Sequence, residues 1–215
     1  MKLRNCFRWG LPLFFTALLL EGQVAAPRIG VVHYGDGSVW TLNGLRANFI
    51  VGSRLFQSAT AASFSDEGGL VAIPGEVDLV HLDGSVIGRY PTDEDQPDLN
   101  ITGGILSATV WLPSKEILLR WDGKSFVAAE PEFSDPAFYQ NSFTLFSDAD
   151  GFEVQAADGS TRTLPITAPD VRIERMSGDW LHLSSASAHR DWALLLNEKE
   201  LKLSELPALA REAGK

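Results

Sequence analysis

The chain is a succession of short runs in which apolar and polar residues alternate, and tight turns separate these runs. Glu76–Tyr90 shows the pattern most clearly: an apolar run leads into Asp83-Gly84, and a second β-prone run follows. Asp-Gly between two such runs favours a two-residue hairpin, because the turn requires positive φ at its central residues. This stretch therefore predicts a β-hairpin.

The same kind of turn recurs along the chain at a nearly constant interval. Successive turns are 47, 39, 36 and 39 residues apart, and they begin at Asp36, Asp83, Asp122, Asp158 and Asn197. Helical periodicity is almost absent, and most hairpins have room for two further strands before them. A period near 40 residues is typical of four-stranded β-propeller blades. We therefore predict an all-β fold, a small β-propeller of about four to five blades.

Residues at fixed distances before the turns form an apolar set and a variable set. The residues four positions before the turns are all apolar: Val32, Leu79, Leu118, Val154 and Ala193. The residues two positions before share no chemistry: Tyr34, His81, Arg120, Ala156 and Leu195. We expect the apolar set to face the core. Because binding residues concentrate at variable positions of a rigid scaffold, Tyr34, His81 and Arg120 are the candidate binding residues.

One unit of the repeat resembles a known kind of blade. Phe64-Ser65-Asp66-Glu67-Gly68-Gly69, together with Leu70–Ile73 and Val77–Tyr90, resembles a blade of the tryptophan–aspartate or TolB-type β-propeller superfamily. Phe146–Gly151 echoes the first motif, and Trp121-Asp122 ends a predicted third strand. The Gly-His pair that usually partners Trp-Asp in that family is missing. The resemblance covers most of the chain and implies a ring of similar blades.

The first hairpin leaves the closure of such a ring open, because it lacks two upstream strands. Either Ala47–Phe56 completes that blade, or the ring closes in another way. A regular ring predicts that the corners at Gly37, Gly84, Gly123 and Gly159 occupy matching places in successive sheets. The alternative fold is a β-sandwich, in which the Asp-Gly turns are ordinary hairpins.

The N-terminus has the order of a secretory signal peptide. Lys2, Arg4 and Arg8 precede the apolar run Leu11–Leu20, and small residues up to Ala26 follow. The apolar run is shorter than the roughly 18 residues that a membrane span needs. We predict a signal segment over 1–26, a propeller domain over 27–206 and a short tail over 207–215. The mature protein is then periplasmic or extracellular, or tethered to a membrane if the segment is not cleaved.

Composition limits the possible partners. The formal net charge is −10 over 215 residues, and no basic patch is visible, which argues against a nucleic-acid partner. Nothing after the signal segment predicts membrane insertion. The single cysteine is Cys6, inside the signal segment, so the mature chain has no disulfide and no thiol nucleophile.

Candidate chemistry is sparse. His33 and His81 lie on corresponding predicted strands, but no histidine pair has the spacing of metal ligands. The acidic runs 92–98 and 147–151 resemble calcium loops but lack the later ligands. Neither a Gly-x-Ser-x-Gly elbow nor a phosphate-binding loop occurs. We therefore assign no catalytic residue, metal or cofactor.

The sequence favours a non-catalytic, exported binding module for a protein or glycan partner. One alternative is a carbohydrate-active hydrolase, with two carboxyl groups brought together at the mouth of the propeller channel. The other alternative is a β-sandwich adhesion or carbohydrate-binding domain.

Overall fold

A computed structural model describes residues 26–45, 48–130, 138–140, 143–148, 151–197 and 200–209. Residues 1–25 of the predicted signal segment and residues 210–215 of the predicted tail lie outside these ranges. The described strands fall between Arg28 and Glu205, inside the predicted domain.

The strands form five antiparallel sheets, each built from strands that are consecutive in the sequence. The first sheet contains β1 (Arg28–His33), β2 (Val39–Leu45) and β3 (Asn48–Phe56). The second contains β4 (Ala61–Phe64), β5 (Gly68–Ile73), β6 (Glu76–His81) and β7 (Val86–Pro91). The third contains β8 (Asp98–Asn100), β9 (Thr109–Leu112), β10 (Ile117–Trp121) and β11 (Phe126–Ala129). The fourth contains β12 (Phe138–Gln140), β13 (Phe143–Asp148), β14 (Gly151–Ala156) and β15 (Thr161–Leu164). The fifth contains β16 (Val171–Ser177), β17 (Trp180–Ser185), β18 (Arg190–Asn197) and β19 (Glu200–Glu205).

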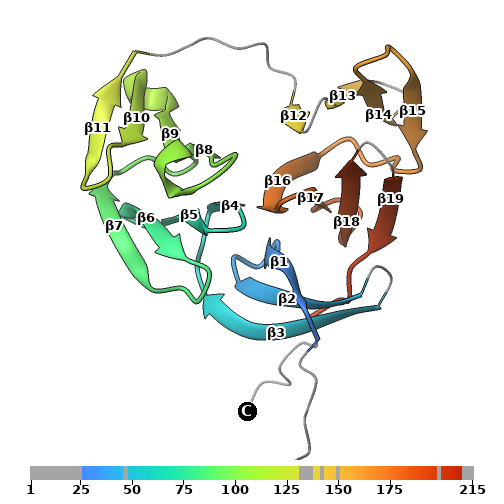
Figure 1. Cartoon of the computed structure of the whole chain (residues 1–215), viewed down its shortest axis with the longest axis horizontal. Coiled ribbons are helices and arrows are strands. Elements are labelled where there is room, and N and C mark those ends of the chain that lie inside the picture. Colours follow the sequence, from blue (N-terminus) through green and yellow to red (C-terminus); the bar gives the residue numbers. More distant parts are fainter. Residues whose placement is uncertain are drawn as a thin grey trace, which may run out of the picture.

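The five sheets stand around a common centre, each with its first strand innermost (Figure 1). Two short 3₁₀ turns, η1 (Ile105–Ser107) and η2 (Pro113–Lys115), interrupt the third sheet. The protein is a β-propeller of five blades, which confirms the predicted all-β propeller. Because the sheets are arranged radially, the β-sandwich alternative is wrong.

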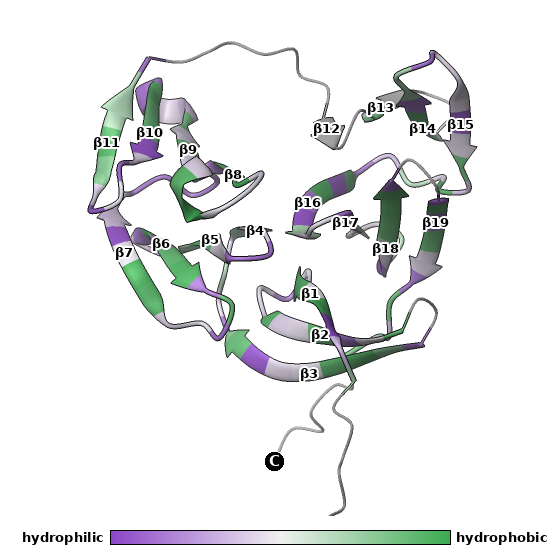
Figure 2. Ribbon diagram, in the orientation of Figure 1, coloured by the Kyte–Doolittle hydropathy of each residue, from purple (hydrophilic) through white to green (hydrophobic). Residues whose placement is uncertain are grey.

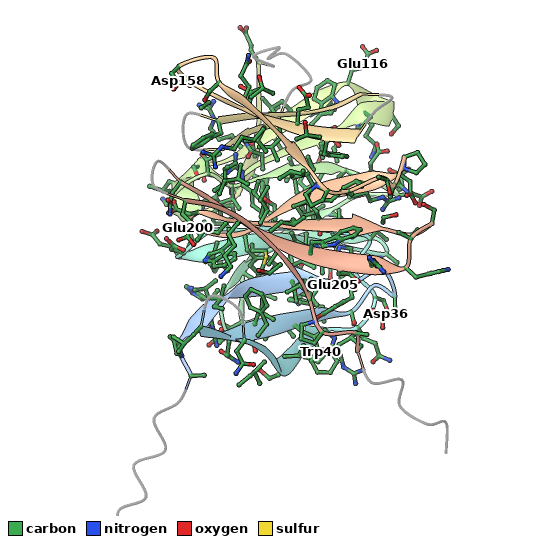
Figure 3. The ribbon with its side chains drawn as sticks, turned by 90° about the vertical axis from the view of Figure 1, so that its right-hand side faces the viewer. Asp36, Trp40, Glu116, Asp158, Glu200 and Glu205 are labelled. Carbon is green, nitrogen blue, oxygen red and sulfur yellow. The ribbon has the colours of Figure 1, made fainter. Side chains whose placement is uncertain are left out.

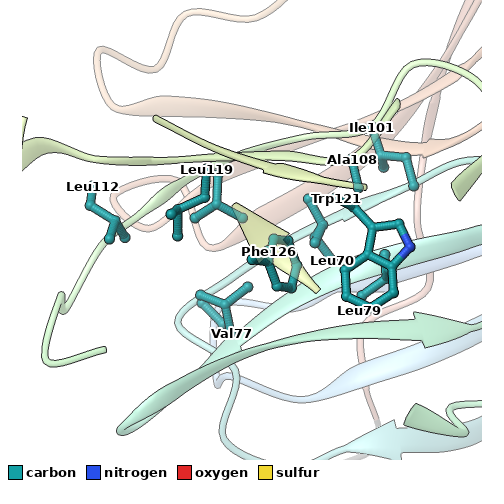
Figure 4. Packing of buried hydrophobic residues seen from close by; sticks show 11 residues of the cluster. Leu70, Val77, Leu79, Ile101, Ala108, Leu112, Leu119, Trp121 and Phe126 are labelled. Atoms are coloured by element: carbon teal, nitrogen blue, oxygen red, sulfur yellow. The ribbon is translucent and has the colours of Figure 1, made fainter. Parts of the chain in front are cut away.

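Apolar clusters fill the spaces between neighbouring sheets. The cluster between the second and third sheets includes Leu70, Leu79, Leu119 and Trp121 (Figure 4). Further clusters lie between the first and second, the first and fifth, and the fourth and fifth sheets. Burial of each large aliphatic side chain stabilises the fold by about 1.5–3 kcal/mol, so these interfaces hold the ring together.

The alternation expected from the sequence is present in the strands. Of the predicted core positions, Val32, Leu79, Val154 and Ala193 are buried, and Leu118 is half-buried. Apolar residues run along strands such as β18, whose middle is a continuous buried stretch (Figure 2). A strand that is covered on both faces by neighbouring sheets can be apolar throughout, and β18 meets this condition.

The first sheet departs from the predicted regularity, because β1 runs opposite to the neighbouring inner strand. Ser177 Oγ donates a hydrogen bond to the carbonyl of Ile29 at 2.8 Å, while His33 Nδ1 lies 3.0 Å from Glu174 Oε1. The start of β1 therefore contacts the end of β16, and the end of β1 contacts an earlier residue of β16, so the two strands are antiparallel. By contrast, the residue that follows β16, Gly178, lies against the loop that follows β4.

The corner at Gly37 consequently does not match the others. Gly84, Gly123 and Gly159 each join the third and fourth strands of a sheet, whereas Gly37 joins β1 to β2. Figure 3 shows Asp36 and Asp158, which precede two of these glycines, at opposite ends of the ring. The prediction of matching places is right for three corners and wrong for Gly37. An Asp-Gly turn fits any tight hairpin and does not specify which strands it joins.

The segment upstream of the second blade belongs to the first sheet. Asn48–Phe56 forms β3 and pairs with β2, so the first blade has three strands where the others have four. The first of the two possibilities that the sequence left open is therefore correct: this segment belongs to the first blade and pairs with the hairpin through β2.

Candidate binding site at one end of the channel

A cavity of about 960 Å³ opens at the end of the ring where the Asp36-Gly37 turn lies. Its walls come from the end of β1, the segments that lead into β4 and β8, the start of β16, and the loop between β17 and β18. The residues that carry its chemistry are His33, Tyr34, Asp36, Asp170, Glu174 and Asp191. Since the walls belong to separate blades, the ring itself creates the cavity.

A chain of four ionisable side chains, called the floor, lies at this cavity: His33, Glu174 and Asp191 line it, and His182 is buried behind them. Glu174 on β16 contacts His33 Nδ1 at 3.0 and 3.2 Å with its two oxygens. His182 on β17 places Nδ1 3.6 Å from Glu174 Oε2 and bonds Asp191 Oδ1 through Nε2 at 2.9 Å. The His33 and His182 side chains are 10% and 1% exposed. The chain therefore links three strands of the fifth sheet to β1 in a largely water-excluded place.

Both histidines lie between acceptors. His33 Nε2 lies 3.1 Å from the carbonyl oxygen of Ala59, while its Nδ1 faces Glu174. His182 has a carboxylate on each side. A neutral imidazole donates from only one nitrogen, so the doubly protonated ring is the form that satisfies both partners.

Two of these groups have shifted pKa values. Burial by itself would raise the pKa of Glu174, but His182 and His33 outweigh it and hold that pKa at about 2. Burial by itself would lower the pKa of His182, but Asp191 and Glu174 outweigh it and raise that pKa. These shifts favour a negatively charged Glu174 beside a positively charged His182, so the two opposite charges balance each other in the floor.

The rim carries the carboxylates of Asp36 and Asp170, for which the described part of the chain shows no ion pair. Asp36 accepts hydrogen bonds from the amide and hydroxyl of Ser38. Asp170 accepts from the hydroxyls of Ser185 and Ser187 and from the Ser187 amide, and these bonds hold its pKa well below the usual range. Neutral donors stabilise a carboxylate without removing its negative charge. The rim is therefore electronegative.

Tyr34 is the predicted binding residue that the structure places in this cavity. The side chain is 3% exposed, and its hydroxyl donates a hydrogen bond to the carbonyl of Pro207 at 3.2 Å. Burial, with Asp191 and Asp36 nearby, raises the pKa of Tyr34. Through this hydrogen bond Tyr34 holds the segment after β19 in place, and Ala208 and Leu209 of that segment line the cavity.

The other two predicted residues lie elsewhere. His81 ends β6 and Arg120 stands near the end of β10, both exposed. β6 and β10 run away from the cavity end, so both residues lie toward the opposite end of the ring. The structure therefore does not bring Tyr34, His81 and Arg120 into one site.

Sequence reasoning singled out His33 but missed the other three residues of the floor, Glu174, His182 and Asp191. His182 stands in the apolar run Trp180–Leu183, where a buried histidine needs partners, and that was the available signal. Its partner Glu174 gives no comparable signal, because it looks like one of many surface acids until the sheets are assembled. Among the described residues, no group of three or more His, Cys, Asp or Glu side chains is arranged to hold a metal ion.

Comparison with known proteins gives no family. No protein-family model matches the chain, and no curated protein matches it. A solved structure of PorZ, an essential bacterial surface component of the type-IX secretion system of Porphyromonas gingivalis, is similar at 12% identity and a TM-score of 0.37. That match covers 86% of this chain and 34% of PorZ. A eukaryotic initiation factor is similar at 10% identity and a TM-score of 0.27, over 83% of this chain and 60% of that one.

This chain thus spans about a third of the length of PorZ. The propeller assignment rests on the five sheets of this chain and not on either likeness. No helix in the described ranges has the length and apolar character that a membrane crossing needs.

Proposed function

We propose that the protein is a non-catalytic binding module, exported from the cytoplasm, that holds a protein partner at the cavity end of its channel. The observation that carries this proposal is the 960 Å³ cavity, whose walls come from separate blades and whose floor is fixed by a hydrogen-bonded network. Concave sites with a few well-held polar groups are the usual places for ligands. Export rests on the signal-like order of residues 1–26.

The charge of the rim favours a polypeptide over a glycan. Asp36 and Asp170 are stabilised by neutral donors, and Asp95 is exposed at the same opening. Arg190 is paired with Glu205 at 3.7 Å, which leaves Arg172 as the main opposing charge. Lysine and arginine side chains complement such a rim, whereas a neutral sugar gains little from it. A basic polypeptide segment is therefore the partner class that we propose.

The ionisation of the floor argues against the hydrolase alternative. A glycosidase needs one carboxylic acid whose pKa is raised so that it stays protonated as the general acid. Glu174 is shifted the other way, to about 2, and Asp170 is also shifted down. These carboxylates are built to stay ionised, which suits the binding of cations.

A binding experiment with matched variants tests this proposal. Fluorescently labelled lysine-rich, glutamate-rich and neutral peptides, and a panel of neutral oligosaccharides, are titrated against the mature protein and followed by anisotropy. We expect the lysine-rich peptide to bind, and the D95N/D170N double variant to weaken its binding at least tenfold.

The control is the double variant H81A/R120A, which changes the opposite end of the ring. It should leave the affinity for the lysine-rich peptide unchanged. If H81A/R120A abolishes binding and D95N/D170N does not, the partner binds the far end and the cavity proposal is overturned. Binding of oligosaccharides but of no peptide would overturn the choice of partner class.

A further inference from the structure

The contact between the first and fifth sheets is made without any shared strand. Each sheet contains only consecutive strands, so in the described chain no sheet joins the two ends of the sequence. β1 lies against β16 instead, and a Cβ added at Gly30 would come within 3.0 Å of the Met176 carbonyl. Side-chain packing and side-chain bonds therefore hold the ring closed at this junction.

This junction also separates two groups of sheets. Apolar clusters connect the first, second and third sheets, and another connects the fourth and fifth. Across the junction, the contacts include the cluster of Val32, Met176 and Ala193, the network centred on Glu174, and the hydrogen bond from Ser177 to Ile29. Gly178 also lies against Asp66 of the loop after β4. Loss of the network therefore acts on the contact between the two groups and not on their interiors.

The geometry of the network favours a charged His182 ring. Glu174 bonds His33 Nδ1 and lies 3.6 Å from His182 Nδ1, which is an ion-pair distance without a hydrogen bond. His33 also faces the Ala59 carbonyl, and His182 bonds Asp191 through Nε2. If the His182 ring loses a proton, one of its nitrogens becomes an acceptor that faces another acceptor. In a low-dielectric site, two facing acceptors repel, and the lost ion pair leaves a carboxylate uncompensated.

We infer that this network is a pH-responsive junction, which holds the first and fifth sheets together in mildly acidic solution and loosens as His182 loses its proton. Opening of this junction would separate β1 from β16 and would enlarge the cavity, because both strands contribute to its floor. The inference concerns the junction itself and does not depend on what the cavity binds.

Other ionisable groups face the network without sharing this behaviour. They are Tyr34 and Asp36 beside β1, Asp170 and Arg172 on the β16 side, and His189 and Arg190 at the start of β18. The raised pKa of Tyr34 keeps its hydroxyl neutral, and the lowered pKa of Asp170 keeps its carboxylate charged. His189 is exposed on the loop before β18 and is not part of the network. His182 is therefore the buried group of the network whose charge changes as the pH rises.

The direction of the pH effect follows from linkage. The pKa of His182 is raised above 6.5, so its contribution is complete below pH 6.5 and is lost as pH rises through the folded pKa. The pKa of Glu174 is lowered from 4.5 to about 2, so its contribution is complete above pH 4.5 and is lost as pH falls toward 2. The junction should be tightest between these limits.

Hydrogen exchange measured by mass spectrometry tests the inference on the unmodified protein at pH 5.5 and 8.5, after correction for intrinsic exchange. Peptides that cover β1 and β16 should lose at least about tenfold more protection at pH 8.5 than peptides that cover β5 and β6. Equal protection factors in β1 and β16 at the two pH values would overturn the inference. So would an equal loss of protection in β5 and β6, which would indicate global unfolding.

Two variants assign the effect to the network. H33Q removes the ring that bonds Glu174 from β1, and we expect its β1 and β16 peptides to show low protection at both pH values. H81Q, which changes an exposed histidine outside the network, should keep the full pH dependence of the unmodified protein. A pH dependence that persists unchanged in H33Q would contradict the inference, and one that disappears in H81Q would contradict it as well.

Discussion

His33 Nδ1 lies 3.0 Å from Glu174 Oε1, although 141 residues separate the two in the sequence. The pair joins the first strand of the chain to the inner strand of the last blade. Because the side chains are 10% and 17% exposed, water screens the interaction weakly. This contact lies at the closure of the ring and also at the floor of the cavity.

Replacement of Glu174 by glutamine should destabilise the protein by about 3 kcal/mol, because it removes the carboxylate that lies between the His33 and His182 rings and leaves the buried, charged His182 with one partner fewer. The measurement is urea denaturation at pH 6. H81Q is the matched control and should stay within about 0.5 kcal/mol of the unmodified protein, since His81 is exposed. Equal stability of E174Q and the unmodified protein would show that the network contributes little.

Substitution of Gly69 by alanine should destabilise the fold by about 1–3 kcal/mol through overpacking. A Cβ at Gly69 would overlap the ring of Phe64, which is 2% exposed on the neighbouring strand. G35A is the control, because no atom lies within 4 Å of a Cβ built there. Thermal unfolding should show a lower Tm for G69A than for G35A; the reverse order would contradict the packing argument.

Gly84 should tolerate asparagine better than alanine. Its φ is +86°, a left-handed conformation that costs an alanine about 1–2 kcal/mol and an asparagine less. The nearest atom to an added Cβ is Leu55 Cδ2 at 3.5 Å, so the effect is conformational and not steric. Chemical denaturation of G84A and G84N gives the comparison, and equal losses would exclude the backbone explanation.

Tyr34→Phe should release the segment that follows β19. The variant loses the hydrogen bond to the Pro207 carbonyl, which contributes about 1 kcal/mol, and keeps the aromatic packing. We expect faster hydrogen exchange in a peptide that covers residues 206–209, with β5 and β6 unchanged. Unchanged exchange in residues 206–209 would mean that the packing of Leu206 and Leu209 alone holds this segment.

Much of the local architecture was readable from the sequence. The Asp-Gly corners, the apolar residues four positions before them and the spacing near 40 residues predicted strands, hairpins and the number of blades within one. These features depend on residues that are neighbours in the chain, such as Asp83, whose carboxylate accepts the Ser85 amide at 2.9 Å within the turn. A turn of this kind forms wherever its residues occur.

The sequence by itself determined the strands, their hairpins and the repeat, because side-chain alternation and turn chemistry act over a few residues. The tertiary structure decided that β1 runs against β16, that Gly37 lies at the opposite end from Gly159, and that Glu174 meets His33 and His182. These outcomes depend on how the ring closes between residues far apart in the chain. The pattern of residues in Arg28–His33 predicts a strand, but it does not predict whether that strand is parallel or antiparallel to β16.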